Sequence, residues 1–123
     1  MISLPSLAQI DGMGPRIWLA VQPADMRCGF DRLAEIARTV IGQDPLSGHL
    51  FVFRGRGGSR LKVLYWDRDG YALWYKRLEE GAFKLPAVPA GAASVELRAS
   101  EMAMLLEGID LRTLRRTKRY TRT

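Results

Sequence analysis

Three strand-like runs separated by turn signals fill the middle of this 123-residue chain and constrain its fold more than any other feature. They cover residues 50–53, 61–66 and 71–77, and the first, Leu-Phe-Val-Phe, is apolar throughout. The pair Asp69-Gly70, typical of tight hairpins, separates the last two runs. Runs joined by such short connections pair as antiparallel neighbours. We therefore predict a meander whose first strand is buried on both faces.

Further strands and a helix are expected around this meander. Residues 17–21 form a short apolar run with β-branched and aromatic members, and residues 82–85 are expected to add a short edge strand. After residues 17–21 and before the meander, apolar side chains at three- and four-residue spacing predict a helix that starts near Met26. Asp25 is its expected N-cap and Gly42 its expected end.

A second amphipathic helix is expected from about residue 99 to residue 107, after a linker of mostly Pro, Ala and Gly. Together these elements predict an α+β fold: an antiparallel meander of four to five strands with two amphipathic helices and a basic C-terminal tail. We divide the chain into a loosely ordered lead-in (1–15), a single α+β domain (16–111) and a basic tail (112–123).

Charge is distributed unevenly along the chain, whose net charge is +6. Residues 1–111 contain thirteen basic and thirteen acidic side chains, whereas residues 112–123 contain six basic and no acidic ones. A cationic tail on a neutral body is typical of an arm that binds anions, most often nucleic acid. A solubilising end explains the charge equally well. The candidate phosphate contacts in the tail are Arg112, Arg115, Arg116, Lys118 and Arg119.

A glycine-rich basic loop connects the first two strands of the predicted meander. Its sequence is Arg-Gly-Arg-Gly-Gly-Ser-Arg, and a lysine follows in the next strand. Glycines allow a backbone to approach phosphates closely, and arginines bind phosphates through two parallel hydrogen bonds. Turn geometry explains the glycines better, while the density of arginines favours phosphate contact. The candidate phosphate contacts here are Arg54, Arg56, Arg60 and Lys62.

Residues capable of catalysis are few and scattered. Asp67 and Asp69 would suit a metal-dependent nuclease, but two turn aspartates before a glycine more often shape a hairpin. Cys28 lacks a neighbouring base, and the single His49 is better explained as structural. No Cys/His cluster has the spacing of a zinc site. We assign no catalytic residue, metal or cofactor.

Five aromatic residues flank the predicted hairpin: Tyr65, Trp66, Tyr71, Trp74 and Tyr75. Aromatic side chains on a sheet can stack on nucleic-acid bases. Strand alternation divides these residues between the two faces, so at least half are expected in the core.

The chain has no sign of membrane insertion or secretion. No apolar run approaches the roughly 20 residues that a membrane span needs, and the start lacks the basic region of a signal peptide. A single cysteine cannot form an internal disulfide, which fits a reducing compartment. We expect a cytoplasmic protein with no membrane contact.

Several blocks of sequence resemble a known family. They include residues 16–20 (Arg-Ile-Trp-Leu-Ala), 43–56 (Gln-Asp-Pro-Leu-Ser-Gly-His-Leu-Phe-Val-Phe-Arg-Gly-Arg), 66–70 (Trp-Asp-Arg-Asp-Gly) and 104–110 (Met-Leu-Leu-Glu-Gly-Ile-Asp). In combination they are similar to TnpB, the family of small accessory proteins from insertion-sequence-sixty-six-type bacterial transposons. The lead-in before Arg16 looks longer than is usual in that family. An unrelated RNA-guided nuclease shares the family's name, and nothing here resembles it.

The resemblance implies a role in transposition, with strand transfer performed by a separate, larger transposase. We expect a non-enzymatic accessory factor that binds DNA, such as the transposon ends, through the basic loop and tail. The transposase and the element's other accessory protein are its expected partners. Two alternatives remain: an adaptor that binds the transposase through the second helix or a Trp66/Trp74 surface, and the metal-dependent nuclease using Asp67 and Asp69.

Overall fold

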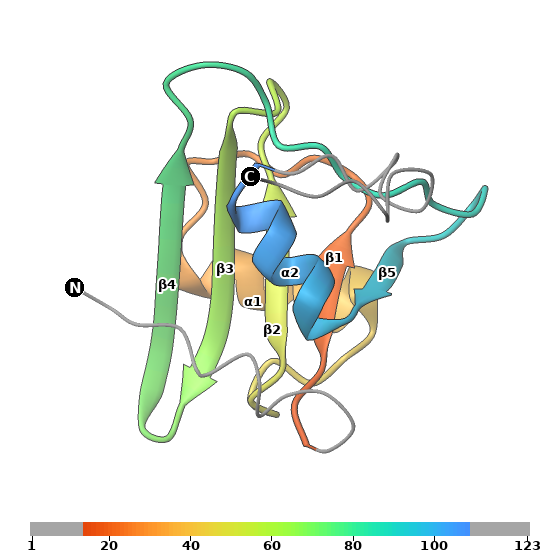
Figure 1. The fold of residues 1–123 in the computed structure, drawn as a ribbon. Coiled ribbons are helices and arrows are strands. Elements are labelled where there is room, and N and C mark those ends of the chain that lie inside the picture. Colours follow the sequence, from red (N-terminus) through yellow and green to blue (C-terminus); the bar gives the residue numbers. More distant parts are fainter. Residues whose placement is uncertain (1–13, 109–123) are drawn as a thin grey trace.

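The apolar run forms β2 (Leu50–Arg54), the central strand of a five-stranded sheet, and its first four side chains are fully buried. The architecture is that of a computed structural model, which describes residues 14–108 (Figure 1). The other elements are β1 (Ile17–Ala20), α1 (Phe30–Ile36), the π-helical turn η2 (Ala37–Ile41), β3 (Arg60–Asp67), β4 (Gly70–Arg77), β5 (Ser94–Leu97) and α2 (Ala99–Leu106). They confirm the α+β class.

The strands lie in the order β4-β3-β2-β1-β5. β2, β3 and β4 form the predicted antiparallel meander, with Phe51 opposite Leu64 and Val63 opposite Trp74. β1 instead pairs in parallel with β2, because α1 and η2 carry the chain across one face of the sheet between these two strands. The sheet is therefore mostly antiparallel, with one parallel pair.

The fifth strand lies elsewhere than the sequence pattern indicated. Residues 82–85 form no strand. Phe83 donates one backbone hydrogen bond to the Gly58 carbonyl at 2.8 Å, and its ring is buried. This bond anchors the connection after β4 without forming a ladder. The fifth strand is β5, which pairs antiparallel with β1 at the opposite edge of the sheet.

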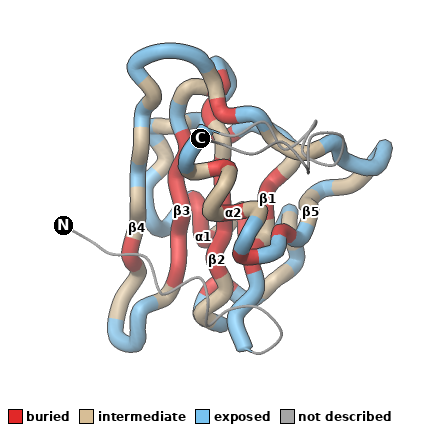
Figure 2. The backbone as a smooth tube through the Cα atoms, viewed as in Figure 1, coloured by how far each residue is buried: buried red, intermediate tan, exposed pale blue. Residues whose placement is uncertain are grey.

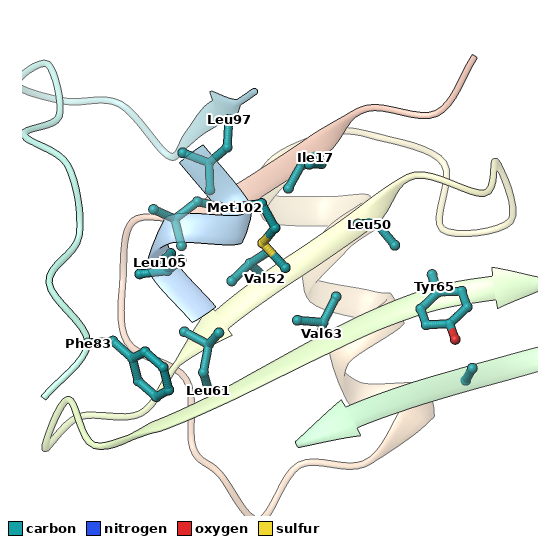
Figure 3. Packing of buried hydrophobic residues seen from close by; sticks show 12 residues of the cluster. Ile17, Leu50, Val52, Leu61, Val63, Tyr65, Phe83, Leu97, Met102 and Leu105 are labelled. Atoms are coloured by element: carbon teal, nitrogen blue, oxygen red, sulfur yellow. The ribbon is translucent and has the colours of Figure 1, made fainter. Parts of the chain in front are cut away.

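A helix covers each face of the sheet, which produces three layers (Figure 1). On one face, Met102 and Leu105 of α2 pack in the same cluster as Val52 (Figure 3). On the other face, Leu33 of α1 packs in a cluster with Phe51. Burial is accordingly concentrated on β2 and β3, between the helices (Figure 2). The predicted burial of β2 on both faces is confirmed.

The first helix starts later than predicted. It begins at Phe30 rather than near Met26, and Gly29 is its N-cap. The carbonyls of Met26 and Cys28, which would accept hydrogen bonds in a helix starting there, instead accept hydrogen bonds of 2.7 and 2.8 Å from the Lys62 ammonium. Backbone groups engaged in this way are not available for a helical turn.

Both helical segments end at or near a glycine with a positive φ. Gly42 ends η2 in a left-handed conformation (φ +82°), as predicted, and donates a hydrogen bond of 2.9 Å to the Ala37 carbonyl. α2 ends at Leu106, two residues before Gly108 (φ +85°). The Lys76 ammonium donates a hydrogen bond of 3.1 Å to the Leu106 carbonyl. No helix within residues 14–108 is long and apolar enough to cross a membrane.

His49 has a structural role just before β2. Its Nδ1 accepts a hydrogen bond of 2.9 Å from the Arg16 N–H, which assigns the neutral ring with its proton on Nε2. The ring lies edge-on between Trp18 and Phe51, with centroid separations of 6.4 and 6.3 Å. Partial burial, followed by the charge of Arg16, lowers the pKa of His49 below its ordinary value of 6.5.

Acidification is expected to destabilise the fold through His49. The unfolded chain binds a proton on this ring near pH 6.5, whereas the folded protein binds it only at lower pH. The contribution of neutral His49 to the free energy of unfolding is therefore complete above pH 6.5, and it is lost as the pH falls through and below that value. His49→Asn retains an acceptor for the Arg16 N–H but does not titrate. Urea unfolding between about pH 7.5 and 5.5 should show a smaller loss for this variant than for the wild type. Equal losses would contradict the assignment.

Candidate nucleic-acid interface

The loop between β2 and β3 is tightly folded, and its glycines serve packing. The Gly58 N–H donates a hydrogen bond of 3.0 Å to the Gly55 carbonyl, closing a turn. Gly58 has a positive φ of +85°, and a Cβ atom there would lie 3.1 Å from the Cβ of Ala82. At Gly55 an added Cβ atom would lie 2.7 Å from Cγ of Met26. This supports turn geometry, rather than phosphate contact, as the reason for these glycines.

A cleft of about 610 Å³ separates this loop from the chain segment that follows β1. In Figure 1 that segment, coloured orange, passes over the same end of the strands as the loop. A parallel bridge between Ala24 and Gly55 joins the two segments. We name this feature the arginine cleft. Its lining residues are Ala24, Asp25, Met26, Arg27, Arg56, Gly57, Gly58, Ser59 and Arg60.

The arginines of the loop differ from most exposed cations because they have no carboxylate partner. Six arginines within residues 14–108 have a carboxylate oxygen within 4.0 Å: Arg16, Arg27, Arg38, Arg68, Arg77 and Arg98. Arg56 and Arg60 are exposed and have none in this part of the chain. Arg32 and Lys84 share that state, but they do not line the cleft. Among these four cations, the two that line the cleft both come from the loop.

Arg54 lies apart from these two exposed arginines. Its side chain is partly buried, and its Nε is enclosed without a hydrogen-bond partner among the described residues. A Cβ atom added at Gly58 would lie 3.8 Å from its Nη1. Arg54 therefore packs behind the loop rather than along the cleft.

Asp25 and Arg27 form an ion pair on the wall opposite the loop. The Asp25 carboxylate accepts hydrogen bonds from the Arg27 N–H at 2.9 Å and from Arg27 Nη2 at 2.8 Å, so it does not cap α1. These bonds, aided by the charges of Arg27 and Arg56, lower the pKa of Asp25 to about 2. Asp25 is thus ionised at neutral pH. Three arginines and one aspartate leave the lining of the cleft with a net charge of +2.

Lys62 does not belong to this exposed cationic group. It is 6% exposed, and its ammonium donates hydrogen bonds to the Met26 carbonyl at 2.7 Å and the Cys28 carbonyl at 2.8 Å. The same ammonium lies 4.8 Å from the ring centroid of Tyr75. Because these contacts occupy it, we remove Lys62 from the candidate phosphate contacts. Its position in the apolar pattern of β3 was the available signal for burial.

The remaining candidates fall at separate places. Trp66 lies edge-on to Tyr71, 5.1 Å between centroids, on the α1 side of the sheet. Trp74 packs against the core beneath α2. The two tryptophans thus form no common surface, and the Trp66/Trp74 interface is wrong. Asp67 and Asp69 are exposed in the β3–β4 turn, where Arg68 lies between them.

Cys28 and His49 are also far apart in the fold. Cys28 lies beside the loop end of β2, and His49 precedes the opposite end of that strand. Within residues 14–108, no three His, Cys, Asp or Glu side chains lie close enough to hold a metal ion. The tail residues Arg112, Arg115, Arg116, Lys118 and Arg119 lie outside the described residues.

Arg27 is the cleft residue that sequence reasoning missed. It is 29 residues from Arg56 in the chain, and its side chain is 92% exposed. No local pattern placed the two together, because their proximity depends on the hydrogen bond between Ala24 and Arg54.

Comparison with known proteins identifies close relatives. A family model described as IS66 Orf2 like protein matches residues 15–116. The chain is 43% identical over 111 residues to the protein y4hO of Sinorhizobium fredii, spanning 90% of this chain and 95% of that protein. It is 37% identical over 103 residues to the protein y4jC of the same organism, spanning 84% and 86% of the two chains. No solved structure matches it significantly.

Two neighbouring glycines of the loop are expected to respond differently to alanine. Gly58→Ala should lower the free energy of unfolding by about 1–3 kcal/mol, because a side chain there is strained and contacts Ala82. Gly57 has no atom within 4 Å of an added Cβ and no positive φ, so Gly57→Ala is the matched control. Its stability should change little. Urea unfolding measures both, and equal effects would contradict this geometry.

Lys62→Met is expected to destabilise the protein. The substitution leaves the carbonyls of Met26 and Cys28 without their donor, at a cost of about 1–3 kcal/mol. Lys84→Met, at an exposed position, is the control and should change stability by less than about 0.5 kcal/mol. The measurement is urea unfolding. A Lys62→Met variant as stable as the wild type would show that these hydrogen bonds contribute nothing.

Proposed function

Because the chain belongs to the IS66 Orf2-like family of transposition accessory proteins, we propose that it binds DNA phosphates in support of a separate transposase. The contacts would come from the arginine cleft and from the basic tail. Cationic side chains of this kind position a protein on the DNA backbone without reading sequence. Recognition of transposon ends would then depend on further contacts or on the transposase.

The observation that supports this proposal most directly is the state of Arg56 and Arg60. Both are exposed and line the same cleft, and neither has a carboxylate partner within residues 14–108. A guanidinium without a carboxylate is available to bind a phosphate through two parallel hydrogen bonds. The tail adds six cations without an acidic residue.

Arg27 joins this proposed set, and Arg54 has a lesser part in it. The Arg27 side chain is 92% exposed, and its guanidinium already binds the Asp25 carboxylate, so a phosphate would compete with or bridge that pair. Arg54 is enclosed at Nε and is expected to shape the loop more than to contact DNA.

The salt dependence of DNA binding is expected to report these contacts. Affinity falls with salt, and each phosphate contact adds about 0.9 to the magnitude of the slope of log affinity against log salt on duplex DNA. The double variant Arg56→Ala/Arg60→Ala should therefore reduce the magnitude of that slope by up to about 1.8. A truncation ending at Leu111 should lower it further. Binding is measured by fluorescence anisotropy on a terminal inverted repeat of the element and a scrambled sequence.

The matched control is Arg16→Ala/Arg98→Ala. Both arginines are exposed and ion-paired. They lie at the start of β1 and the end of β5, at the end of the strands that is opposite to the loop. The control should retain the slope of the wild type. A loop variant that matches the wild type, or affinity that is flat across salt, would overturn the proposal. If the full-length protein binds no DNA, the adaptor becomes the better explanation, and co-purification with the transposase from nuclease-treated, high-salt lysate tests it.

A further inference from the structure

Two aromatic side chains are exposed within residues 14–108, one at the first residue of α1 and one on β4. Five large hydrophobic residues are exposed within residues 14–108: Phe30, Val40, Leu46, Tyr75 and Val88. Phe30 and Tyr75 are the aromatic members, with exposed fractions of 46% and 49%. An aromatic ring left half in water is a candidate contact surface.

The register of the sheet places Tyr75 next to the cleft. In the β3–β4 ladder Arg60 is opposite Arg77, and Lys62 is opposite Tyr75. Arg60 and Tyr75 are therefore diagonal neighbours on the same face, at the roughly 7–8 Å typical of such pairs. This is the α1 side of the sheet, which faces away from the viewer in Figure 1. Since Arg60 lines the cleft, the Tyr75 ring lies at its border.

Lys62 links Tyr75 to the segment that forms one wall of the cleft and leads into α1. Its ammonium lies 4.8 Å from the centroid of the Tyr75 ring and donates a hydrogen bond to the Cys28 carbonyl. Phe30, the first residue of α1, is two positions after Cys28. The Tyr75 ring and the residues that lead into α1 therefore both contact this one ammonium.

Charge on this border favours an anionic ligand with an adjacent planar group. Arg77 binds the Glu79 carboxylate at 3.1 Å, whereas the opposite Arg60 has no carboxylate partner in the described part of the chain. Like charges directly opposite each other in a ladder repel, and a bound phosphate relieves that repulsion. A phosphate at Arg60 would place its neighbouring base within reach of Tyr75.

We infer that the arginine cleft binds single-stranded DNA, with a base stacked on Tyr75, a second aromatic contact at Phe30, and phosphates on Arg56 and Arg60. The inference rests on the proposed DNA binding and names its substrate class. A duplex hides the faces of its bases, so an aromatic side chain that stacks on a base requires an unpaired strand. Proteins that bind single strands combine aromatic side chains that stack on bases with cationic side chains that bind the phosphates.

The test compares full-length protein on a labelled single strand of 20 nucleotides and on the duplex of the same sequence, by fluorescence anisotropy. The wild type should bind the single strand more tightly. Tyr75→Leu should weaken binding to the single strand by at least about 5-fold, and binding to the duplex by less than about 2-fold. Tyr75→Phe should retain affinity because it keeps the ring. Leu46→Ala, at an equally exposed apolar position before the opposite end of β2, is the control.

A second measurement on the wild-type protein avoids any loss of folding in the variants. A single strand carrying 5-iodouracil is irradiated on the protein, and the crosslinked peptides are identified by mass spectrometry. Crosslinks at Tyr75 or Phe30 would support the inference. Crosslinks confined to other peptides would overturn it.

The outcomes separate this inference from the proposal on which it rests. If Arg56→Ala/Arg60→Ala weakens binding but Tyr75→Leu does not, and duplex binds as tightly as single strand, base stacking is wrong while DNA binding stands. The exposed rings would then be assigned to a protein partner. If the wild type binds neither form of DNA, both proposals fail.

Discussion

Both faces of β2 are closed to water, and the arrangement of the other elements follows from that constraint. Leu50, Phe51, Val52 and Phe53 are each 0% exposed, and they alternate between two cores. One helix is required on each side, since an open sheet face would leave half of this strand in water. α1 covers one face as part of the crossover from β1, and α2 covers the other after the chain has passed beyond the meander. The loop lies at the end of the sheet where β2 stops, which neither helix covers.

Lys62 is the second point on which the candidate site depends. A buried ammonium must have hydrogen-bond acceptors, and here two backbone carbonyls, of Met26 and Cys28, supply them. These bonds hold the segment after β1 against β3. That segment is one wall of the arginine cleft and presents Arg27, while Arg56 and Arg60 come from the other wall. Lys62 therefore positions the site without facing it.

The chain carries two groups of cations, one in the loop between β2 and β3 and one in the tail. The loop arginines have defined neighbours, and their availability follows from the lack of nearby carboxylates among the described residues. The tail contributes six basic residues and no acidic one. The chain belongs to a family of transposition accessory proteins. Under the proposed function, both groups of cations would bind DNA in support of a separate transposase.

Local signals in the sequence determined the meander, the approximate limits of the helices and the stop at Gly42, because alternation, helical periodicity and turn residues act over a few positions. The family resemblance and the density of arginines in the loop were also visible there. Tertiary structure alone decided the parallel pairing of β1, the position of β5 and which carbonyls bind the ammonium of the buried Lys62. It also brought Arg27 to Arg56 and Tyr75 to Arg60. The physical reason is the same in each case: these contacts join residues distant in the chain, and they depend on which backbone groups must be satisfied once both faces of the sheet are covered.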